Sequence, residues 1–457
     1  MIACFDIMTP MKTLTIIGGG ASGLAAAVAA GEKLARMGRE QRFEKVRVVV
    51  YEADDRVGRT ILATGNGRCN FSNEDVRASL YRNADFVGSA LLDFEIRACS
   101  EVTSQRKRST SYGSGVLGFF SDCGLCWRGE SEGRLYPLAN KATSVLEVLR
   151  AAAAAAGVEE RCDARVDALE PPRKPGSRYT LHLHDGSFER ADAVILATGG
   201  KSAIRLPAQL PWIEPRPVLG PLATDTRLVR QLDNIRVKAA LELRRAGKRI
   251  AWEEGEVLFR KYGVSGIAVF NLSRFAQPGD ALMVDFIPWI RAVDMESFLN
   301  RRRKLLRPHA NDPLTCGDML RGMVLPQVAH VLLESAGLSE RTRYERGHVA
   351  VLVDLLKGFE LHVEGIGDAR QCQVHRGGVG VSALDSRTME ARELPGLYVT
   401  GELADVDAPC GGYNLHWAWA SGLLAGWSAA ELLTGVVGFT DDCGSDAHRE
   451  IQNGGAR

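Results

Sequence analysis

Two patterns of glycine and acidic residues in this sequence are suited to holding a nucleotide. The first, Gly18-Gly19-Gly20-Ala21-Ser22-Gly23, follows an apolar run and precedes a helix-forming run, and Glu52 ends the next apolar run. In such a strand–turn–helix, Gly18 allows the tight turn, Gly20 lets the backbone approach a pyrophosphate, and Gly23 lets helix and strand pack closely. Free N–H groups at the helix start face the phosphates, and Glu52 can accept the ribose hydroxyls. The pattern predicts a dinucleotide site rather than a glycine turn that binds nothing.

The second pattern lies near the end of the chain. Gly401-Glu402 follow a short apolar strand, and Gly411-Gly412 precede a helix rich in small residues. The start of that helix is a positive end, which would stabilise negative charge on the N1/O2 side of a reduced flavin. Glu402 could bind the ribityl hydroxyls. An NAD-only dehydrogenase has no need of this second station, so the pattern predicts FAD.

A glycine-rich loop runs from Asp55 to Asn73, where the backbone could pass close to a flat ligand. Arg59 and Arg68 in this loop could face a phosphate or carboxylate, or they could form surface salt bridges. Cys69 has no partner nearby in sequence and is expected to be a small buried residue rather than a nucleophile.

Cys123 and Cys126 form a CxxC pair, which can be a redox pair or half of a zinc site. The sequence has no second CxxC, and Trp127 and Arg128 do not complete a metal set. We therefore expect two free thiols, and no metal site is predicted.

Alternating apolar and β-branched residues predict the strands that position these patterns. The predicted strands are Leu14–Ile17, Val46–Tyr51, Arg165–Leu169, Tyr179–His184, Ala193–Gly200 and Leu397–Thr400. The run Ala193–Gly200 ends on glycines, as at the carboxyl edge of a parallel sheet where ligands bind. Residues 141–156 form a helix by propensity.

The character of the chain changes near residue 208. Several prolines mark a crossing, and residues 220–290 contain short alternating strands that predict a small antiparallel barrel or sandwich. Residues 294–357 are helical by period, with breaks near Pro308 and Pro313.

Composition narrows the function classes. Lys+Arg number 57 and Asp+Glu 56, so no global charge attracts nucleic acid or an anionic membrane. No apolar segment is long enough to predict a membrane span, and the first ten residues do not form a secretory signal. Ten cysteines lie scattered without a repeating frame, which favours the reducing cytoplasm.

Six segments resemble, in order, the motifs of the BaiN-type (YhiN-like) flavoprotein family. They are GGGASGLAAA, DRVGRTILATGNGRCNFSN, ATGG, LFRKYGVSG, TMEARELPGLYVTGE and APCGGYNLHWAWASG. The resemblance implies an NAD(P)/FAD-dependent oxidoreductase of α/β class, in which a β-barrel interrupts a Rossmann-like FAD domain and itself carries a helical insert. The domains it implies are residues 1–207 with 371–436 for FAD, 208–293 with 345–370 for the barrel, 294–344 for the helical insert, and a polar tail at 437–457.

The resemblance also implies cofactor roles for the matched residues. The first turn, with Gly18, Gly20, Ala21, Ser22 and Gly23, lies at the pyrophosphate. Glu52 lies at the adenosine ribose, and Val166 holds adenine through its backbone. The remaining predicted cofactor residues are Arg59, Asn66, Gly67, Arg68, Cys69 and Asn70 along the flavin, Thr198, Gly199 and Gly200 at the strand end, and Gly401, Glu402, Gly412, Tyr413 and Asn414 at the ribityl chain and ring.

The chain departs from the family pattern at two places. Arg260-Lys261 and His375-Arg376 stand where the family usually has small or neutral residues. We predict that these four residues define the substrate side of the flavin, with His375 as a proton donor. The alternative is a satisfied buried histidine and three solvated cations.

Three function classes remain open from the sequence. The first is a reductase in which NADH or NADPH reduces FAD and the flavin passes hydride to a small organic acceptor such as an enone. The second is an oxidase or dehydrogenase of an amine or hydroxy compound. The third is a non-catalytic redox sensor that uses Cys123 and Cys126. The sequence leaves the substrate and the oligomeric state open.

Overall fold

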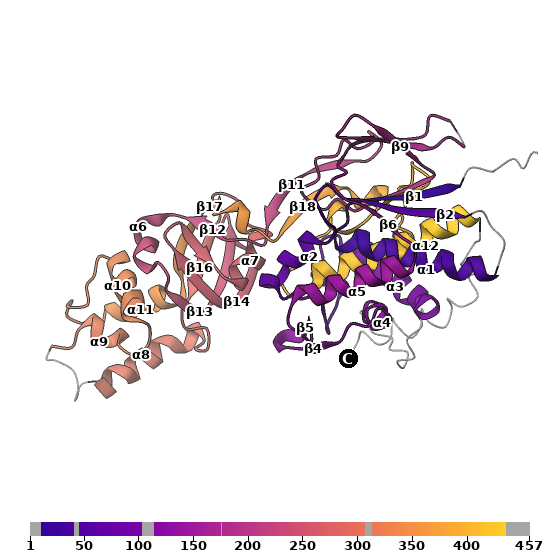
Figure 1. Cartoon of the computed structure of the whole chain (residues 1–457). Coiled ribbons are helices and arrows are strands. Elements are labelled where there is room, and N and C mark those ends of the chain that lie inside the picture. The colour runs from indigo at the N-terminus through magenta and orange to yellow at the C-terminus, as the bar shows by residue number, and fades with distance from the viewer. Residues whose placement is uncertain (1–10, 41–44, 103–113, 175, 307–312, 436–457) are drawn as a thin grey trace, which may run out of the picture. The chain divides into compact units, whose positions relative to one another are not determined.

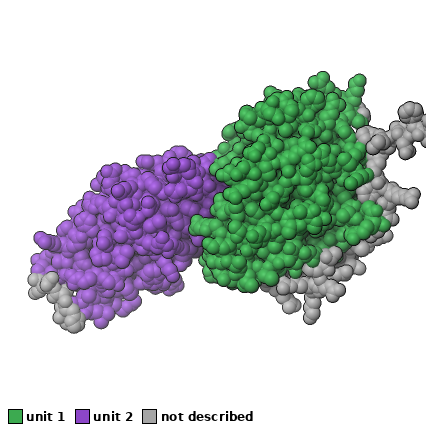
Figure 2. All heavy atoms as spheres, in the orientation of Figure 1, with its two compact units in different colours: residues 1–216, 375–457 green, residues 217–374 purple. Residues whose placement is uncertain are grey.

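The computed structural model of the protein describes residues 11–40, 45–102, 114–174, 176–306 and 313–435 (Figure 1). The chain divides into two compact units (Figure 2). Unit 1 comprises residues 1–216 and 375–457, and unit 2 comprises residues 217–374. The predicted polar tail lies outside the described residues, and the predicted domain boundaries stay a prediction.

Unit 1 is built on a five-stranded parallel sheet. Its strands, in spatial order, are β19 (Leu397–Val399), β10 (Ala193–Leu196), β1 (Lys12–Ile17), β2 (Val46–Tyr51) and β6 (Glu159–Arg161). The strands β1, β2, β10 and β19 are nearly continuous apolar runs, because helices cover both faces of a parallel sheet. The Rossmann-like arrangement predicted from the sequence is confirmed.

Helices α1 (Ala21–Glu40) and α12 (Tyr413–Thr434) pack together in unit 1. Every residue of α12 from His416 to Ala430 is buried, so this helix is apolar on all sides. Two of its glycines permit the contact with α1. A Cβ atom at Gly422 would lie 2.3 Å from the Ser22 carbonyl oxygen, and one at Gly426 would lie 2.4 Å from that of Ala26.

Further elements of unit 1 surround this core. The helices are α2 (Arg59–Ala63), α3 (Ala84–Glu101), α4 (Ser114–Asp122) and α5 (Ala142–Ala155). One small sheet contains β3 (Ser72–Asn73), β5 (Arg134–Pro137) and β4 (Trp127–Gly129), and another contains β7 (Val166–Glu170), β8 (Tyr179–Leu183) and β9 (Phe188–Ala191). The pair β11 (Trp212–Val218) and β18 (Val374–Val379) carries the chain out of unit 1 and back into it.

Unit 2 contains a closed six-stranded barrel. In spatial order its strands are β12 (Leu222–Thr224), β15 (Gly263–Ser265), β14 (Lys248–Arg260), β13 (Arg236–Arg245), β16 (Ala281–Asp285) and β17 (Phe359–Ile366). The helices are α6 (Thr226–Val229), α7 (Ile267–Ser273), α8 (Ala292–Leu306), α9 (Cys316–Leu320), α10 (Pro326–Ser335) and α11 (His348–Lys357). The sequence allowed a barrel or a sandwich, and the closed ladder of strands decides for the barrel.

The barrel and its helices share one apolar core. Inward residues of the strands, such as Leu241 and Leu282, belong to the same buried cluster as Leu299 of α8 and Leu332 of α10. Among the described residues, no helix is both long and apolar enough to cross a membrane.

Candidate functional site

The glycine turn after β1 is the tightest backbone approach of unit 1. Gly18 has φ +101°, and a Cβ atom there would lie 2.5 Å from the Ala197 carbonyl oxygen. A Cβ atom at Gly23 would lie 1.9 Å from the Gly18 carbonyl oxygen, which explains why helix α1 can start so close to the strand. A Cβ atom at Gly20 would meet only the Thr60 hydroxyl, at 3.2 Å. Gly18 and Gly23 therefore serve the fold, while Gly20 leaves its outer side open.

Glu52 lies directly after β2 and faces the glycine turn. Its Oε2 accepts a hydrogen bond from the backbone N–H of Gly19 (2.8 Å), and its Oε1 accepts one from the N–H of Asp54 (3.0 Å). These two bonds fix the carboxylate beside the start of α1, where a ribose adjoining the pyrophosphate would lie.

The two arginines of the glycine-rich loop are engaged with protein carboxylates. Arg59 is exposed and lies 3.2 Å from Asp54. Arg68 forms an ion pair with Glu130, and its guanidinium lies 4.0 Å from the centroid of the Tyr136 ring. Both contacts match the salt-bridge alternative from the sequence, and the phosphate role of these arginines stays a prediction.

The segment Asn66–Asn70 combines an exposed turn with a buried end. Asn66 (φ +55°) and Gly67 (φ +78°) form the turn in left-handed conformation. Cys69 is fully buried, and burial raises the pKa of its thiol to about 11, so it is unsuited to act as a nucleophile. Asn70 has a buried side-chain oxygen with no hydrogen-bond partner among the described residues.

Two unpaired polar atoms support the fit of a cofactor here. The Thr198 hydroxyl, after β10, is likewise buried without a partner in the described chain. Native proteins rarely leave buried polar atoms unpaired, so Thr198 and Asn70 are suited to contact a bound ligand. Together with the open side of Gly20 and the fixed Glu52, these atoms fit an FAD molecule. Val166, the predicted adenine contact, is a buried residue of β7 paired with Leu183.

The turn before α12 is held close to β3. Gly412 has φ +96°, and a Cβ atom there would lie 2.3 Å from the Ser72 carbonyl oxygen and 2.8 Å from the Asn70 side-chain oxygen. Gly401 (φ +62°) donates its N–H to the Ser421 hydroxyl at 2.9 Å. Gly412 therefore brings the start of α12 against the segment that carries Asn70, and Gly401 joins the loop after β19 to α12.

The predicted ring contacts Tyr413 and Asn414 also have bonds within the protein. Asn414 accepts a hydrogen bond from the Ala408 N–H and donates one to the Ala408 carbonyl, both at 2.9 Å. The Tyr413 carbonyl accepts a hydrogen bond from the Tyr81 hydroxyl at 2.9 Å. The Asn414 side chain therefore closes the loop before α12, and its contact with the flavin stays a prediction.

His375 lies against two predicted cofactor residues. Its backbone N–H donates to Glu402 Oε1 at 2.6 Å, and its ring Nδ1 lies 3.2 Å from the same oxygen. A Cβ atom at Gly200 would lie 2.7 Å from His375 Cβ and 2.4 Å from Glu402 Oε1. The structure therefore brings His375, Glu402 and Gly200 into direct contact.

Arg376 is part of a buried ion pair. Its Nε and Nη2 atoms each donate to a different oxygen of Asp407, both at 2.8 Å, and the Asp407 side chain is fully buried. The two glycines that follow, Gly377 and Gly378, lie close to protein backbone. A Cβ atom at Gly377 would lie 2.8 Å from the Glu214 carbonyl oxygen, and one at Gly378 would lie 2.2 Å from the Leu403 carbonyl oxygen.

Arg260 and Lys261 belong to unit 2, where Arg260 ends β14 and Lys261 lies in the following turn. Arg260 donates a hydrogen bond to the Asn234 side chain, and Lys261 is exposed. Their assignment to the substrate side stays a prediction.

Three residues of this region were missed from the sequence. Asp405 and Asp407 are buried acids in a stretch that is otherwise apolar, and that pattern alone signals buried cations as partners. His416 is fully buried; its Nδ1 lies 2.9 Å from the Ser72 hydroxyl, and burial lowers its pKa to about 3. His416 is therefore a neutral histidine in the first turn of α12.

The CxxC cysteines are both free thiols. Cys123 follows α4 and is partly buried, and burial together with the nearby charges of Glu32 and Asp122 raises its pKa to about 12. Cys126 is exposed. A thiol with a raised pKa is a poor redox nucleophile, which matches the free-thiol expectation.

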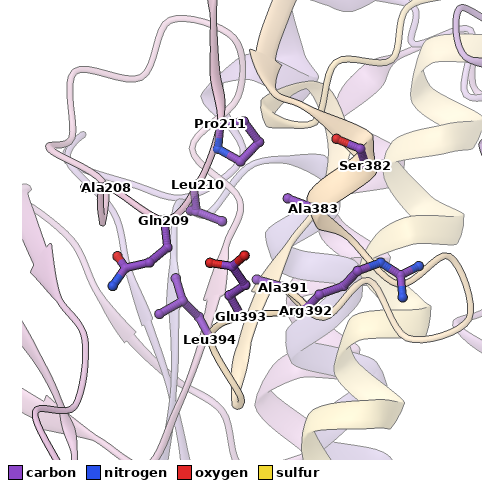
Figure 3. A pocket seen from close by; sticks show the side chains of 10 residues that line it. All are labelled: Ala208, Gln209, Leu210, Pro211, Ser382, Ala383, Ala391, Arg392, Glu393 and Leu394. Atoms are coloured by element: carbon purple, nitrogen blue, oxygen red, sulfur yellow. The ribbon is translucent and has the colours of Figure 1, made fainter.

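A separate cavity of about 380 Å³ lies elsewhere in unit 1. Figure 3 shows the side chains of Gln209, Leu210, Glu393 and Leu394 among those that line it. None of its lining residues is a predicted site residue.

The comparison with known families shows the family and the enzyme class of the chain. The chain matches the HI0933-like protein Rossmann domain over residues 12–428. The chain belongs to this family. Members of the HI0933-like family and their relatives identify it as an FAD-dependent oxidoreductase, so the predicted resemblance, enzyme class and flavin are confirmed.

Three relatives align over nearly the whole chain. A 3-dehydro-bile acid delta(4,6)-reductase from Clostridium scindens is 33% identical, covering 92% of this chain and 100% of its own length. A ribosomal RNA dihydrouridine synthase from Escherichia coli is 28% identical (91% and 96%), and one from Haemophilus influenzae is 26% identical (89% and 95%).

Proposed function

We propose that this flavoenzyme is an NAD(P)H-dependent reductase of a carbon–carbon double bond conjugated to a carbonyl group in a small organic molecule. The observation that carries the proposal is the contact of His375 with Glu402 and Gly200, two predicted flavin residues, which supports His375 as the proton donor. The names of the relatives support the reaction type. A bile acid with a 3-keto group and adjacent unsaturation is an enone, and forming dihydrouridine also adds two hydrogens to a double bond conjugated to a carbonyl.

The geometry of unit 1 supports the following cofactor-binding roles as part of the proposal. The turn at Gly20 would receive the pyrophosphate, Glu52 the ribose, and Asn70 with Thr198 the polar atoms of the ribityl chain or ring. Bound FAD would accept a hydride from NAD(P)H and supply it at N5.

The protein's own part in the reaction is proton delivery. When the β-carbon of an enone receives hydride, the substrate becomes an enolate, and its α-carbon then needs a proton. His375 would give this proton from its imidazolium form, and water would restore it. The Glu402 carboxylate, 3.2 Å from Nδ1, holds the ring in place. The net reaction is NAD(P)H, a proton and the enone giving NAD(P)⁺ and the saturated ketone.

Two features of the sequence favour a small substrate in the cytoplasm. The chain has balanced charge, which gives no field to attract RNA, and its ten cysteines lie scattered without a repeating frame. RNA is nevertheless the substrate named for two relatives, so it is a defined arm of the test.

The experiment is an anaerobic titration of the yellow protein with NADH and, separately, with NADPH. Bleaching of the flavin band by either supports the reductase. Bleaching by an amine or hydroxy compound alone supports the oxidase or dehydrogenase alternative. The bleached protein is then mixed with a 3-keto-4-ene steroid or with a uridine-containing RNA transcript, and the acceptor that restores the yellow band identifies the substrate class.

Replacing His375 tests the proton donor. We expect His375→Ala to keep FAD and to be reduced at the parent rate, because the residue is assigned only to the second half-reaction. Reoxidation by the enone should slow by about 100-fold, the low end of general-acid contributions. Stopped-flow absorbance measures the two half-reactions separately. Reoxidation at the parent rate would show that His375 is not the acid.

A further inference from the structure

Three consecutive residues of strand β18 each bond to one carboxylate of the loop after β19. The His375 N–H donates to Glu402 (2.6 Å), the Arg376 guanidinium donates to Asp407, and the Gly377 N–H donates to Asp405 (3.1 Å). The strand carrying the proposed proton donor is therefore fastened to this loop by three acids.

Of these three contacts, the ion pair between Arg376 and Asp407 is the one with two charge-assisted hydrogen bonds. Two parallel N–H···O bonds of 2.8 Å join the planar guanidinium to the carboxylate, and the side chains are only 11% and 0% exposed. Such a two-bond fork fixes orientation as well as distance. The carbonyl of Asp407 also accepts the Arg82 N–H at 2.8 Å, so the acid is held from its backbone too.

Neighbouring side chains of a strand point to opposite faces. A fork on Arg376 therefore opposes rotation of β18 about its own axis, and such a rotation would turn His375 away from Glu402. We propose that Asp407 is a positioning residue that acts through Arg376 to keep His375 beside Glu402 and Gly200. In this proposal Arg376 positions His375 and does not bind the substrate. The inference rests on the proposed role of His375 as proton donor.

The test compares Asp407→Asn with a matched control in unit 2. Arg245 and Asp280 form the same two-bond pair, at 2.8 Å and 2.8 Å, with an acid that is 2% exposed. Asp280→Asn therefore removes an equivalent carboxylate outside unit 1. Both variants are purified with FAD, reduced with dithionite under anaerobic conditions, and mixed with a 3-keto-4-ene steroid in a stopped-flow instrument at several pH values.

We expect Asp407→Asn to slow reoxidation by about 10-fold or more, since small misplacements of a catalytic group have effects of that size. Asp280→Asn should reoxidise at the parent rate. In the His375→Ala background, Asp407→Asn should cause no further slowing, because its effect passes through His375. The histidine NMR signal that His375→Ala removes should change position in Asp407→Asn and stay unchanged in Asp280→Asn.

Two results would overturn the inference while leaving the proposed function standing. One is parent-rate reoxidation by Asp407→Asn with an unchanged His375 signal. The other is an equal slowing by Asp407→Asn with and without His375. If His375→Ala itself reoxidises at the parent rate, the proposed acid fails instead. Should Asp407→Asn not fold, Arg376→Lys keeps the charge but loses the fork, and the same outcomes apply to it.

Discussion

The two ends of the α1–α12 helix pair differ in whether their buried polar groups have partners within the protein. Contacts of Gly422 with Ser22 and of Gly426 with Ala26 show that the helices run parallel, so both begin toward the side of the predicted cofactor site. At that end the side-chain oxygen of Asn70 has no partner in the described chain, and burial keeps His416 neutral. This end has polar atoms to offer to a ligand.

At the far end, buried charges are matched by opposite charges. Lys33 of α1, only 7% exposed at its side chain, forms ion pairs with Glu101 of α3 and with Glu431 of α12 (2.6 Å). Arg97 of α3 also lies 2.9 Å from Glu431. The network joins three helices. The comparison teaches that the same helices can serve binding at one end and cohesion at the other, and mutations should separate the two.

The largest effect is expected at the cofactor end. Gly20→Val should give a folded but colourless protein, because a Cβ atom at this position meets only the Thr60 hydroxyl within the protein but a valine blocks the approach of the pyrophosphate. Flavin absorbance and far-UV circular dichroism measure the two properties. Gly88→Val is the control, since its Cβ would also lie 3.2 Å from one neighbour, Ala78, and it should stay yellow. A yellow Gly20→Val protein would refute the FAD assignment of this turn.

A smaller effect on folding, with FAD retained, is expected at the far end. Lys33→Met keeps the length of the side chain but leaves Glu101 and Glu431 short of one cation. Breaking a buried ion pair in this way should lower the free energy of unfolding by about 3 kcal/mol, seen as a lower urea midpoint. Arg291→Met, which breaks an exposed pair with Asp294, should cost less than about 1 kcal/mol. Loss of FAD from folded Lys33→Met protein would contradict the separation of the two ends.

The smallest effect is expected from the cysteines near the far end. Burial, and then the charge of Glu32, raise the pKa of the Cys123 thiol. Because Glu32 is the α1 residue beside Lys33, we group Cys123 with the far end of the helix pair. The double variant Cys123→Ser/Cys126→Ser should keep steady-state turnover within a few-fold of the parent, since the raised pKa of Cys123 makes this thiol a poor nucleophile. Lost turnover with retained FAD would restore the redox-pair alternative.

The periodic parts of the fold could be predicted from the sequence. The buried strands β1, β2 and β10 and the barrel strands appear as apolar or alternating runs, and Gly18 and Gly23 as a spaced motif, because these signals are local. The Arg376–Asp407 and His375–Glu402 contacts join residues about thirty positions apart, and no spacing rule encodes them. The close contacts of Gly377 and Gly378 follow from no spacing rule either, since their neighbours are backbone atoms brought close by the tertiary fold.

The burial of α12 has a consequence for the order in which the chain can fold during synthesis. Strand β19 and helix α12, which complete the parallel sheet and the core of unit 1, are made after all of unit 2. Translation from the end of unit 2 at Val374 to the end of α12 at Thr434 takes several seconds at about 5–20 residues per second. The closed barrel can form in that interval, because all its strands are then present. During this time the apolar surface of α1 and the edge of β10 that pairs with β19 remain uncovered on the ribosome. Exposed apolar surface and unpaired strand edges promote aggregation, so a chaperone is most useful at this stage.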